Sequence, residues 1–422
     1  MIALQTIRMD PDRVKAGIRT KGEPDKVDTV LQLDQEHRRL LTAINDLRTE
    51  RNRASRAIGE AKRMGEDASE AMAATRKLGE KLKQTEAEAT RVKQELDTAL
   101  LALPNLPHDS VPVGQSEADN VIVRSWQEKP TFSFPVKNHT ELCDSLGLID
   151  FKRGAKISGS GFPLYTGPGA RLERSLLNYM LDFHTERYGF QEIFPPFITR
   201  YAAMQTTGQL PKFADDMYHI EADDDWLIPT AEVPVTNIHQ DEILLESDLP
   251  RCYAAYSACF RREAGSYGKD TRGLLRLHQF NKVELVKFVH PDTSYDELET
   301  LTAQAEAVLQ SLGLTYRVLA LATGDLSFSA AKCYDLEVWA PGEGQWLEVS
   351  SCSNFESFQA RRGNIRFRSE TTRKVDFVHT LNGSGLATPR LMVALLETYQ
   401  QADGSVRLPE PLSSYFGQDV IG

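Results

Sequence analysis

The chain has 422 residues, of which 41% are hydrophobic and 26% charged, a balance typical of a water-soluble globular protein with about two or three domains. A formal net charge of −11 excludes a protein that coats nucleic acid by overall attraction, although it is compatible with a local basic surface. No stretch of about 18 apolar residues occurs and the first residues lack a basic and then an apolar segment, so neither a membrane span nor a secretory signal is predicted.

Residues 1–110 are predicted to form an N-terminal domain, most of which, about 28–103, is a helical hairpin. Apolar or small residues recur at spacings of three and four in two runs, Val30 to Ile58 and Ala71 to Leu103. The connection around Gly65 is short, so the two helices are expected to pair as an antiparallel coiled-coil arm roughly 50 Å long.

Near the tip of this arm basic residues outnumber acidic ones. On charge alone, an ordinary solvated helix face and a surface that tracks phosphates both remain open. The candidates for contact with nucleic acid are Arg48, Arg51, Arg53, Arg56, Lys62 and Arg63.

A proline-rich stretch, 104–135, is interpreted as a linker, and the second domain is assigned to 111–422. Helices are predicted at Gly169–Tyr188, Glu297–Leu312 and Arg390–Gln400, and strands at Phe190–Phe194, Val283–Val289 and Trp346–Ser351. Two-residue alternation in several separate segments indicates an antiparallel or mixed sheet with helices packed on it, an α+β domain.

Residues that are suited to binding or catalysis are concentrated in four short segments. The first, from Phe260 to Glu284, is predicted to be two strands joined by a loop that bears Lys269, Arg272 and Arg276, and arginine suits recognition of carboxylate or phosphate. A charged surface hairpin would give the same pattern.

The other three segments are each weak alone. Glu348-Val349-Ser350-Ser351 offers two oxygen ligands, three residues apart, for Mg²⁺ against phosphates. Asn382 to Arg390 opens a helix with glycines that permit close backbone approach, and Thr230-Ala231-Glu232 is a short polar pair.

In combination and in this order, the segments resemble the class II aminoacyl-tRNA synthetases. The region near 257–284 resembles motif 2 and the region near 382–400 resembles motif 3. The proline-ended strand near 185–196 resembles motif 1, which forms the dimer interface in that family. With the arm added, essentially the whole chain resembles bacterial-type seryl-tRNA synthetase.

The resemblance implies a class II antiparallel sheet core flanked by helices, with the N-terminal coiled-coil arm. It implies a cytoplasmic homodimer that joins L-serine to ATP as seryl-adenylate, releases pyrophosphate, and passes serine to tRNA(Ser). ATP is then a substrate with Mg²⁺, zinc is not expected, and whether tRNA(Sec) is also charged stays open.

The resemblance also implies roles for individual residues. The catalytic residues are Arg261, Glu348 and Arg390. L-serine is bound by Thr230, Ala231, Glu232, Arg261, Glu284, Asn382 and Ser384. ATP is bound by Arg261, Arg262, Glu263, Arg276, Leu277, Phe280, Glu348, Val349, Ser350, Ser351 and Arg390, with Mg²⁺ on Glu348 and Ser351. The arm residues named above bind tRNA.

One position departs from the common family pattern. Thr388-Pro389 stands where many bacterial members have Val-Gly before the motif 3 arginine. Proline is compatible with an early helix position because its φ is fixed near the helical value.

Two other functions remain open. An amino acid:carrier-protein ligase would share the catalytic core, but such relatives lack the arm and use cysteine-bearing zinc sites. The five cysteines here form no C-x-x-C pair, and Cys252 and Cys259 offer no convincing ligand set. A non-catalytic tRNA-binding paralogue would need only the arm, and it would have no need for the motif arginines and glutamates.

Overall fold

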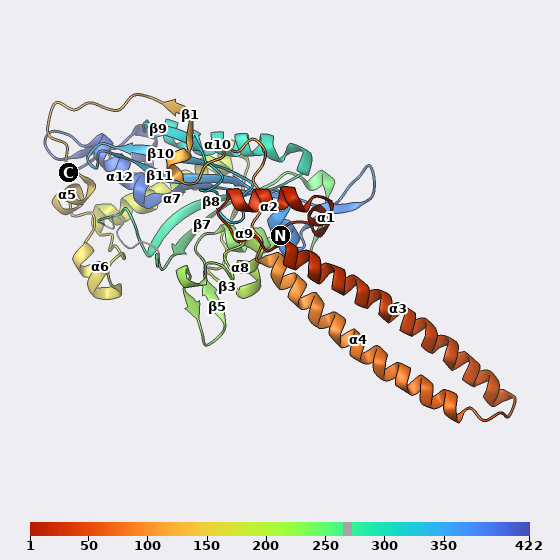
Figure 1. The fold of residues 1–422 in the computed structure, drawn as a ribbon. Helices are drawn as coiled ribbons and strands as arrows, with labels where there is room; N and C mark the ends of the chain where they lie inside the picture. Colours follow the sequence, from red (N-terminus) through yellow and green to blue (C-terminus); the bar gives the residue numbers. More distant parts are fainter. Residues whose placement is uncertain (265–271) are drawn as a thin grey trace. The chain divides into compact units, whose positions relative to one another are not determined.

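A computed structural model of the protein describes residues 1–264 and 272–422. The centre of the predicted motif 2 loop, including Lys269, lies outside the described residues. The chain forms two compact units, Met1–Pro104 and Asn105–Gly422 (Figure 1). In the described part of the chain, no helix combines the length and apolar character that crossing a bilayer requires.

The first unit is helical. Its elements are α1 (Leu4–Met9), α2 (Pro11–Thr20), α3 (Val27–Arg63) and α4 (Ser69–Leu101). Helices α3 and α4 run side by side as the predicted antiparallel arm (Figure 1). Their shared core contains Leu40, Ile44, Leu47, Leu82, Ala89 and Val92.

The arm differs from the predicted seam near its tip. Ala71 and Ala74 are exposed, although the spacing places them in line with the buried residues of α4. A methyl group buries little apolar area, so it contributes little to holding two helices in contact. The apolar seam therefore stabilises the part of the arm nearer its base.

The second unit is built on a sheet of eight strands among the described residues. In spatial order these are β1 (Val121–Trp126), β9 (Tyr316–Ala320), β10 (Lys332–Ala340), β11 (Gln345–Asn354), β14 (His379–Ala387), β8 (Gln279–Val289), β7 (Arg251–Phe260) and β2 (Gln191–Ile193). Neighbours pair antiparallel except β2 with β7. The predicted α+β class with an antiparallel-dominated sheet is confirmed.

Three helices cover one face of this sheet. They are α7 (Gly167–Tyr188), α10 (Ser294–Ser311) and α12 (Thr388–Tyr399), and they share one large apolar core with the strands. Strand alternation sends Val283 and Leu285 of β8 into this core. Lys282 and Glu284 therefore face the opposite side, where the polar site lies.

Shorter elements complete the second unit. The helices are α5 (His139–Ser145), α6 (Phe151–Ser158), α8 (Tyr201–Thr207), α9 (Glu232–Thr236), α11 (Phe358–Gly363) and α13 (Glu410–Phe416). The strands are β3 (Ile198–Arg200), β4 (His219–Ile220), β5 (Asp225–Leu227), β6 (Ile243–Leu245), β12 (Arg366–Arg368), β13 (Val375–Phe377), β15 (Val406–Arg407) and β16 (Val420–Ile421).

The predicted helices and the strands at Phe190–Phe194, Val283–Val289 and Trp346–Ser351 are present with boundaries shifted by a few residues. The first strand of the hairpin predicted from Phe260 lies earlier, because β7 ends at Phe260. Helix α7 is capped at its C-terminal end by Gly189, whose φ of 69° is the left-handed value that glycine adopts most readily. Helix α12 begins at Thr388 with Pro389 in its first turn, as expected for proline there.

The interpretation of 104–135 as a linker was wrong for part of its length. Residues 121–126 form β1, an edge strand paired with β9. Its Val-Ile-Val run is exposed and lies between prolines, so the local pattern resembled a loop. Only pairing with a strand that lies almost two hundred residues later identifies it as part of the sheet.

Candidate active site

A cavity of about 1000 Å³ opens on the polar face of the sheet. Strands β8, β11 and β14 and the loop that follows β7 contribute most of its predicted site residues. The predicted residues that line it are Thr230, Glu232, Arg261, Glu263, Arg276, Leu277, Phe280, Glu348, Val349, Ser350, Ser351, Asn382, Ser384 and Arg390.

Three predicted residues do not line this cavity. Ala231 and Glu284 are fully buried behind its wall. Arg262 has an exposed side chain, and its backbone N–H donates a 2.9 Å hydrogen bond to the carbonyl of Asp216. Glu284 acts on the cavity through its partners, whereas Arg262 does not face the cavity in this structure.

A network of buried polar groups forms one end of the cavity. The Glu284 carboxylate accepts hydrogen bonds from the Thr230 hydroxyl at 3.0 Å and the Asn382 amide at 2.8 Å, and it is paired with Lys282. The Asn382 amide also donates to Glu232 at 3.1 Å. Buried polar groups persist when they are mutually satisfied, so this network holds the Glu232 side chain in place.

Glu232 is the carboxylate of this network whose pKa is raised. Its pKa is raised to about 7 by burial and then by the neighbouring Glu284, while a 2.6 Å hydrogen bond from Gln359 opposes the shift. Burial without a full countercharge disfavours the ionised carboxylate. A cationic ligand at this end of the cavity would therefore be bound strongly.

Arg261 lies between the acidic end and the aromatic wall of the cavity. Its guanidinium carbon is 5.1 Å from the centre of the Phe280 ring, and its Nε donates to the carbonyl of Pro229 at 3.4 Å. The stacked ring and the carbonyl orient the guanidinium, whose planar fork suits carboxylate and phosphate oxygens.

Two further predicted arginines line the same cavity. Arg276 is 2.5 Å from the Glu263 carboxylate. Arg390 donates to the backbone carbonyls of Leu275 at 3.1 Å and Glu348 at 3.0 Å. Glu263 has a φ of 51°, an unusual value for a residue other than glycine and one found often at functional sites.

A cluster of oxygen ligands lies on β10 and β11. The Ser351 hydroxyl donates to Asp335 at 2.6 Å and is 3.2 Å from Glu348. Burial raises the pKa of Asp335 well above its ordinary value, and the nearby Glu348 raises it further. Two carboxylates and a hydroxyl that converge in this way are suited to a hard divalent cation.

Sequence reasoning missed three members of the site. Lys282 stands two residues before Glu284, and strand alternation alone indicates that both face the same side. Asp335 lies opposite Ser351 in the β10–β11 pairing, and Gln359 reaches Glu232 from α11. No local motif signals the last two, because their neighbours come from distant parts of the chain.

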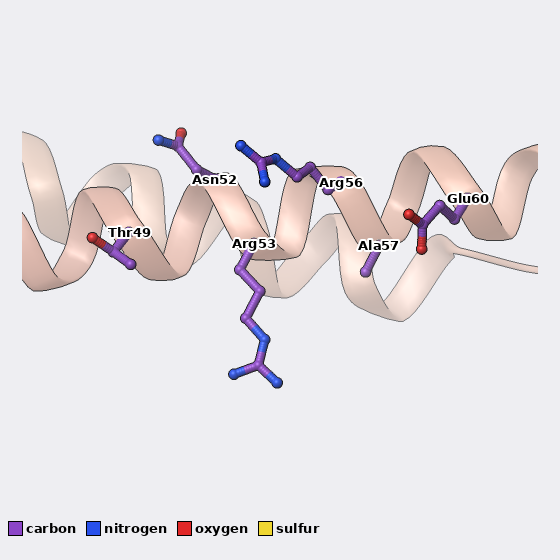
Figure 2. A pocket seen from close by; sticks show the side chains of 6 residues that line it. All are labelled: Thr49, Asn52, Arg53, Arg56, Ala57 and Glu60. Atoms are coloured by element: carbon purple, nitrogen blue, oxygen red, sulfur yellow. The ribbon is translucent and has the colours of Figure 1, made fainter.

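The predicted RNA-contacting residues lie on α3. Arg53 and Arg56 line a shallow hollow of about 490 Å³, with the Asn52 and Arg56 side chains on one side of the helix and Arg53 on the other (Figure 2). Arg48 is paired with Glu86 of α4 at 2.8 Å. Arg53, Arg56, Lys62 and Arg63 are exposed, and Arg51 is half-buried.

The sheet topology and the arginine-lined cavity define a class II aminoacyl-tRNA synthetase. Residues 217–399 match the model of the tRNA synthetase class II core domain (G, H, P, S and T), and residues 1–107 match that of the seryl-tRNA synthetase N-terminal domain. The chain belongs to the seryl-tRNA synthetase family.

Individual relatives agree with this assignment. Proteins named serine–tRNA ligase are 56% identical over 423 residues in Geobacillus kaustophilus (100% of both chains) and 54% over 417 residues in Geobacter sulfurreducens (99% of both). The crystal structure of seryl-tRNA synthetase from Pyrococcus horikoshii complexed with ATP matches with a TM-score of 0.94 and 40% identity, covering 100% of this chain and 99% of that one.

Proposed function

We propose that the protein is a serine–tRNA ligase, which joins L-serine to ATP as seryl-adenylate and transfers serine to the 3′ end of tRNA(Ser). The observation that carries the proposal is the joint presence, in one cavity, of a carboxylate end around Glu232 and the predicted arginines Arg261, Arg276 and Arg390. ATP–pyrophosphate exchange with serine, threonine, alanine and glycine tests it. Exchange that is strongest with serine, followed by charging of tRNA(Ser), is the expected result.

The proposed reaction needs positioning and charge neutralisation more than proton transfer. An oxygen of the serine carboxylate attacks the α-phosphorus of ATP, and the bond to pyrophosphate breaks. Arg261 spans the carboxylate and the α-phosphate and stabilises the charge that develops there, while Arg276 and Arg390 hold the outer phosphates. No protein nucleophile takes part.

Serine selectivity is proposed to come from the buried polar network. Thr230 and Glu232 hold the ammonium group, and Glu284 acts with Asn382 and Ser384 around the hydroxyl. An analogue without the hydroxyl leaves buried polar groups unpaired and is rejected strongly, whereas the extra methyl of threonine is worth only ~1–3 kcal/mol.

The affinity for serine is expected to rise with pH between 6 and 8. Glu232, with a pKa of about 7, is mostly protonated at the lower pH and mostly ionised at the higher. Only the ionised carboxylate pairs with the serine ammonium, so the KM for serine should fall about tenfold over this interval. Steady-state exchange at a series of pH values measures it.

Matched variants test the assignment of this titration to Glu232. Glu232→Gln should weaken serine binding and remove the pH dependence. Glu337→Gln changes another carboxylate of the cavity, which is paired with Arg317 at 2.5 Å. This variant should retain the pH dependence of the KM for serine. A KM that still falls tenfold in Glu232→Gln would show that a different group titrates.

We assign Mg²⁺ to the cluster of Glu348 and Ser351, with Asp335 beside them. The residues fit this ion because the donors are oxygens, which Mg²⁺ prefers. Burial, and then the nearby Glu348, raises the pKa of Asp335, and a cation would compensate the charge of both carboxylates. The bound ion would neutralise phosphate charge in the transition state. Glu348 and Ser351 would hold it, and Arg390, bonded to the Glu348 carbonyl, would remain aligned beside it.

Glu348→Gln is expected to raise the Mg²⁺ concentration for half-maximal exchange about tenfold, because one anionic ligand is lost. Titration of exchange activity with MgCl₂ measures this shift. Glu337→Gln serves as the control and should leave the midpoint unchanged. An unchanged midpoint in Glu348→Gln would remove the residue from the metal site.

We also propose a homodimer located in the cytoplasm. Strand β2 lies at one edge of the main sheet, and Phe194 just beyond it is 76% exposed, as suits a motif 1 interface. The five cysteines are free, which is typical of proteins in a reducing compartment. The arm is assigned to tRNA binding, and its presence favours the ligase over a carrier-protein ligase that lacks it.

A further inference from the structure

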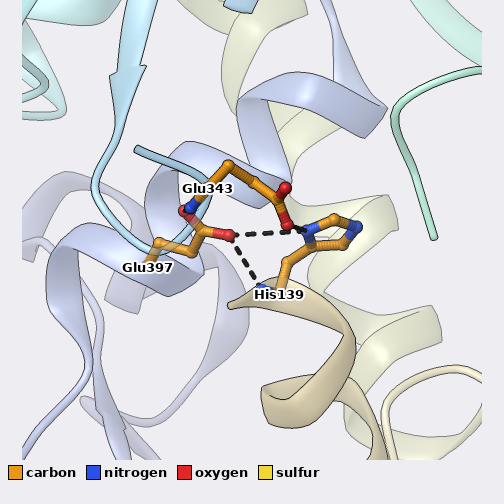
Figure 3. A group of neighbouring side chains, drawn as sticks. All are labelled: His139, Glu343 and Glu397. Atoms are coloured by element: carbon orange, nitrogen blue, oxygen red, sulfur yellow. Dashed lines mark hydrogen bonds and ion pairs between the residues drawn. The ribbon is translucent and has the colours of Figure 1, made fainter. Parts of the chain in front are cut away.

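A buried histidine and two glutamates form a cluster from three separate elements (Figure 3). His139 begins α5, Glu397 lies on α12, and Glu343 lies in the turn between β10 and β11. The Nδ1 atom of His139 is 3.0 Å from the Glu343 carboxylate and 3.4 Å from that of Glu397. The His139 side chain is fully buried, so this arrangement is enforced by the fold.

The hydrogen bond at the other ring nitrogen shows whether Nδ1 of His139 carries a proton or could bind a metal ion. Nε2 of His139 accepts a 3.1 Å hydrogen bond from the backbone N–H of Leu274. A neutral ring that accepts at Nε2 carries its proton on Nδ1, which therefore has no lone pair for a metal ion. Nδ1 lies beside two carboxylates without a hydrogen bond to either, and their negative charge stabilises the tautomer that carries the proton on this atom.

The contacts of Glu397 support the same conclusion. Its carboxylate accepts hydrogen bonds from the backbone N–H groups of His139 at 2.8 Å, Gly342 at 2.8 Å and Glu343 at 3.1 Å. These hydrogen bonds join the turn between β10 and β11 to the start of α5. The cluster therefore fixes the position of the His139 imidazole.

Leu274, whose backbone N–H is bound by the imidazole, is followed directly by two residues that interact with or belong to the arginines of the cavity. The carbonyl of Leu275, the next residue after Leu274, accepts the Nε hydrogen bond of Arg390 at 3.1 Å. Arg276 follows immediately and is paired with Glu263 at 2.5 Å. A displacement at Leu274 would thus move the groups that orient both arginines.

Gly273 shows how closely the backbone approaches the imidazole. A Cβ atom at this position would lie 2.1 Å from Nε2 of His139, and the φ of 57° is one that glycine adopts most readily. The close approach lets the Leu274 N–H reach the ring nitrogen.

We propose that His139 is a positioning residue for ATP, which acts by holding the backbone at Leu274 so that Arg276 and Arg390 are aligned in the cavity. It touches no substrate. This inference rests on the proposed function, since it assigns the two arginines to the phosphates of ATP.

The test is a comparison of His139→Asn and His139→Gln by ATP–pyrophosphate exchange. Asparagine ends near the position of Nδ1 and leaves the Leu274 N–H unpaired, so the KM for ATP should rise about tenfold, the effect typical of one buried hydrogen bond. The KM for serine should stay within about twofold, because the Glu232 end of the cavity is not connected to Leu274. Glutamine extends its amide oxygen to the position of Nε2 and should restore most of the ATP affinity.

Glu343→Gln keeps the proposal testable if the histidine variants fold poorly. It removes charge beside Nδ1, so the ring more often protonates at Nε2 and loses its bond to Leu274, and the KM for ATP should rise about threefold.

His239 and Glu242 provide matched controls, because neither residue lines the cavity. His239 Nδ1 is 2.7 Å from Glu242, and its Nε2 is 2.8 Å from the Tyr253 hydroxyl. His239→Gln and Glu242→Gln should leave both KM values unchanged.

The outcomes separate the two proposals. A wild-type enzyme without serine-dependent exchange would overturn the proposed function. An active wild type with an unchanged KM for ATP in His139→Asn and Glu343→Gln would overturn only the role of His139. Equal increases in the KM for ATP and for serine would indicate general destabilisation and would likewise overturn it.

Discussion

Replacing Arg261 with alanine is expected to lower serine-dependent ATP–pyrophosphate exchange by about a thousandfold while the fold stays intact. The guanidinium is stacked 5.1 Å from the Phe280 ring and lines the cavity beside the acidic network. Removing a preoriented group that stabilises transition-state charge typically costs about 3–4 kcal/mol. Exchange rates at saturating serine and ATP measure the loss.

Two variants make this prediction specific. Arg261→Lys keeps the charge but loses the planar fork, so its exchange rate should fall between those of the wild type and the alanine variant. Arg251→Ala removes an arginine from the other end of β7, where it is paired with Asp248 at 2.9 Å, and should leave exchange unchanged. Normal exchange in Arg261→Ala, with an unaltered melting temperature, would contradict the assigned mechanism.

Shortening the arm is expected to separate the two half-reactions. Arg48 of α3 is level with Glu86 of α4, so joining Ile44 to Thr90 through a short glycine turn removes the distal hairpin while the remaining helices stay level. Serine activation should stay within about twofold, since the second unit has its own core. Charging of tRNA(Ser) should fall at least about a hundredfold, because the basic residues that would contact phosphates are lost.

The salt dependence of charging provides an independent check on the arm. Phosphate contacts make affinity fall steeply with salt, so the KM of the wild type for tRNA should rise strongly between about 50 and 200 mM salt. A charge-reversed arm, Arg53→Glu with Arg56→Glu, should weaken that dependence, and exchange should be unaffected. If the shortened enzyme charged tRNA(Ser) at the wild-type rate, the arm would have no part in RNA binding.

Sequence reasoning predicted the long helices, the strands β2, β8 and β11 of the main sheet, and the family of the protein. Heptad spacing is local, so the register of α3 and α4 follows from apolar residues such as Leu40 and Leu82. The motif residues of β7, β8 and β14 are also recognised within short segments. For this reason most of the predicted site residues line one cavity.

The way in which distant segments meet depends on the tertiary structure. Asp335 joins the Glu348 cluster because β10 pairs with β11 in one particular register, and Gln359 reaches Glu232 across 127 positions of the chain. The edge strand β1 and the contact of His139 with Leu274 likewise depend on partners far along the sequence. Local periodicity reports which face of an element is apolar, but it carries no information about which distant polar group will lie opposite, because that is determined by strand pairing and by burial in the finished fold.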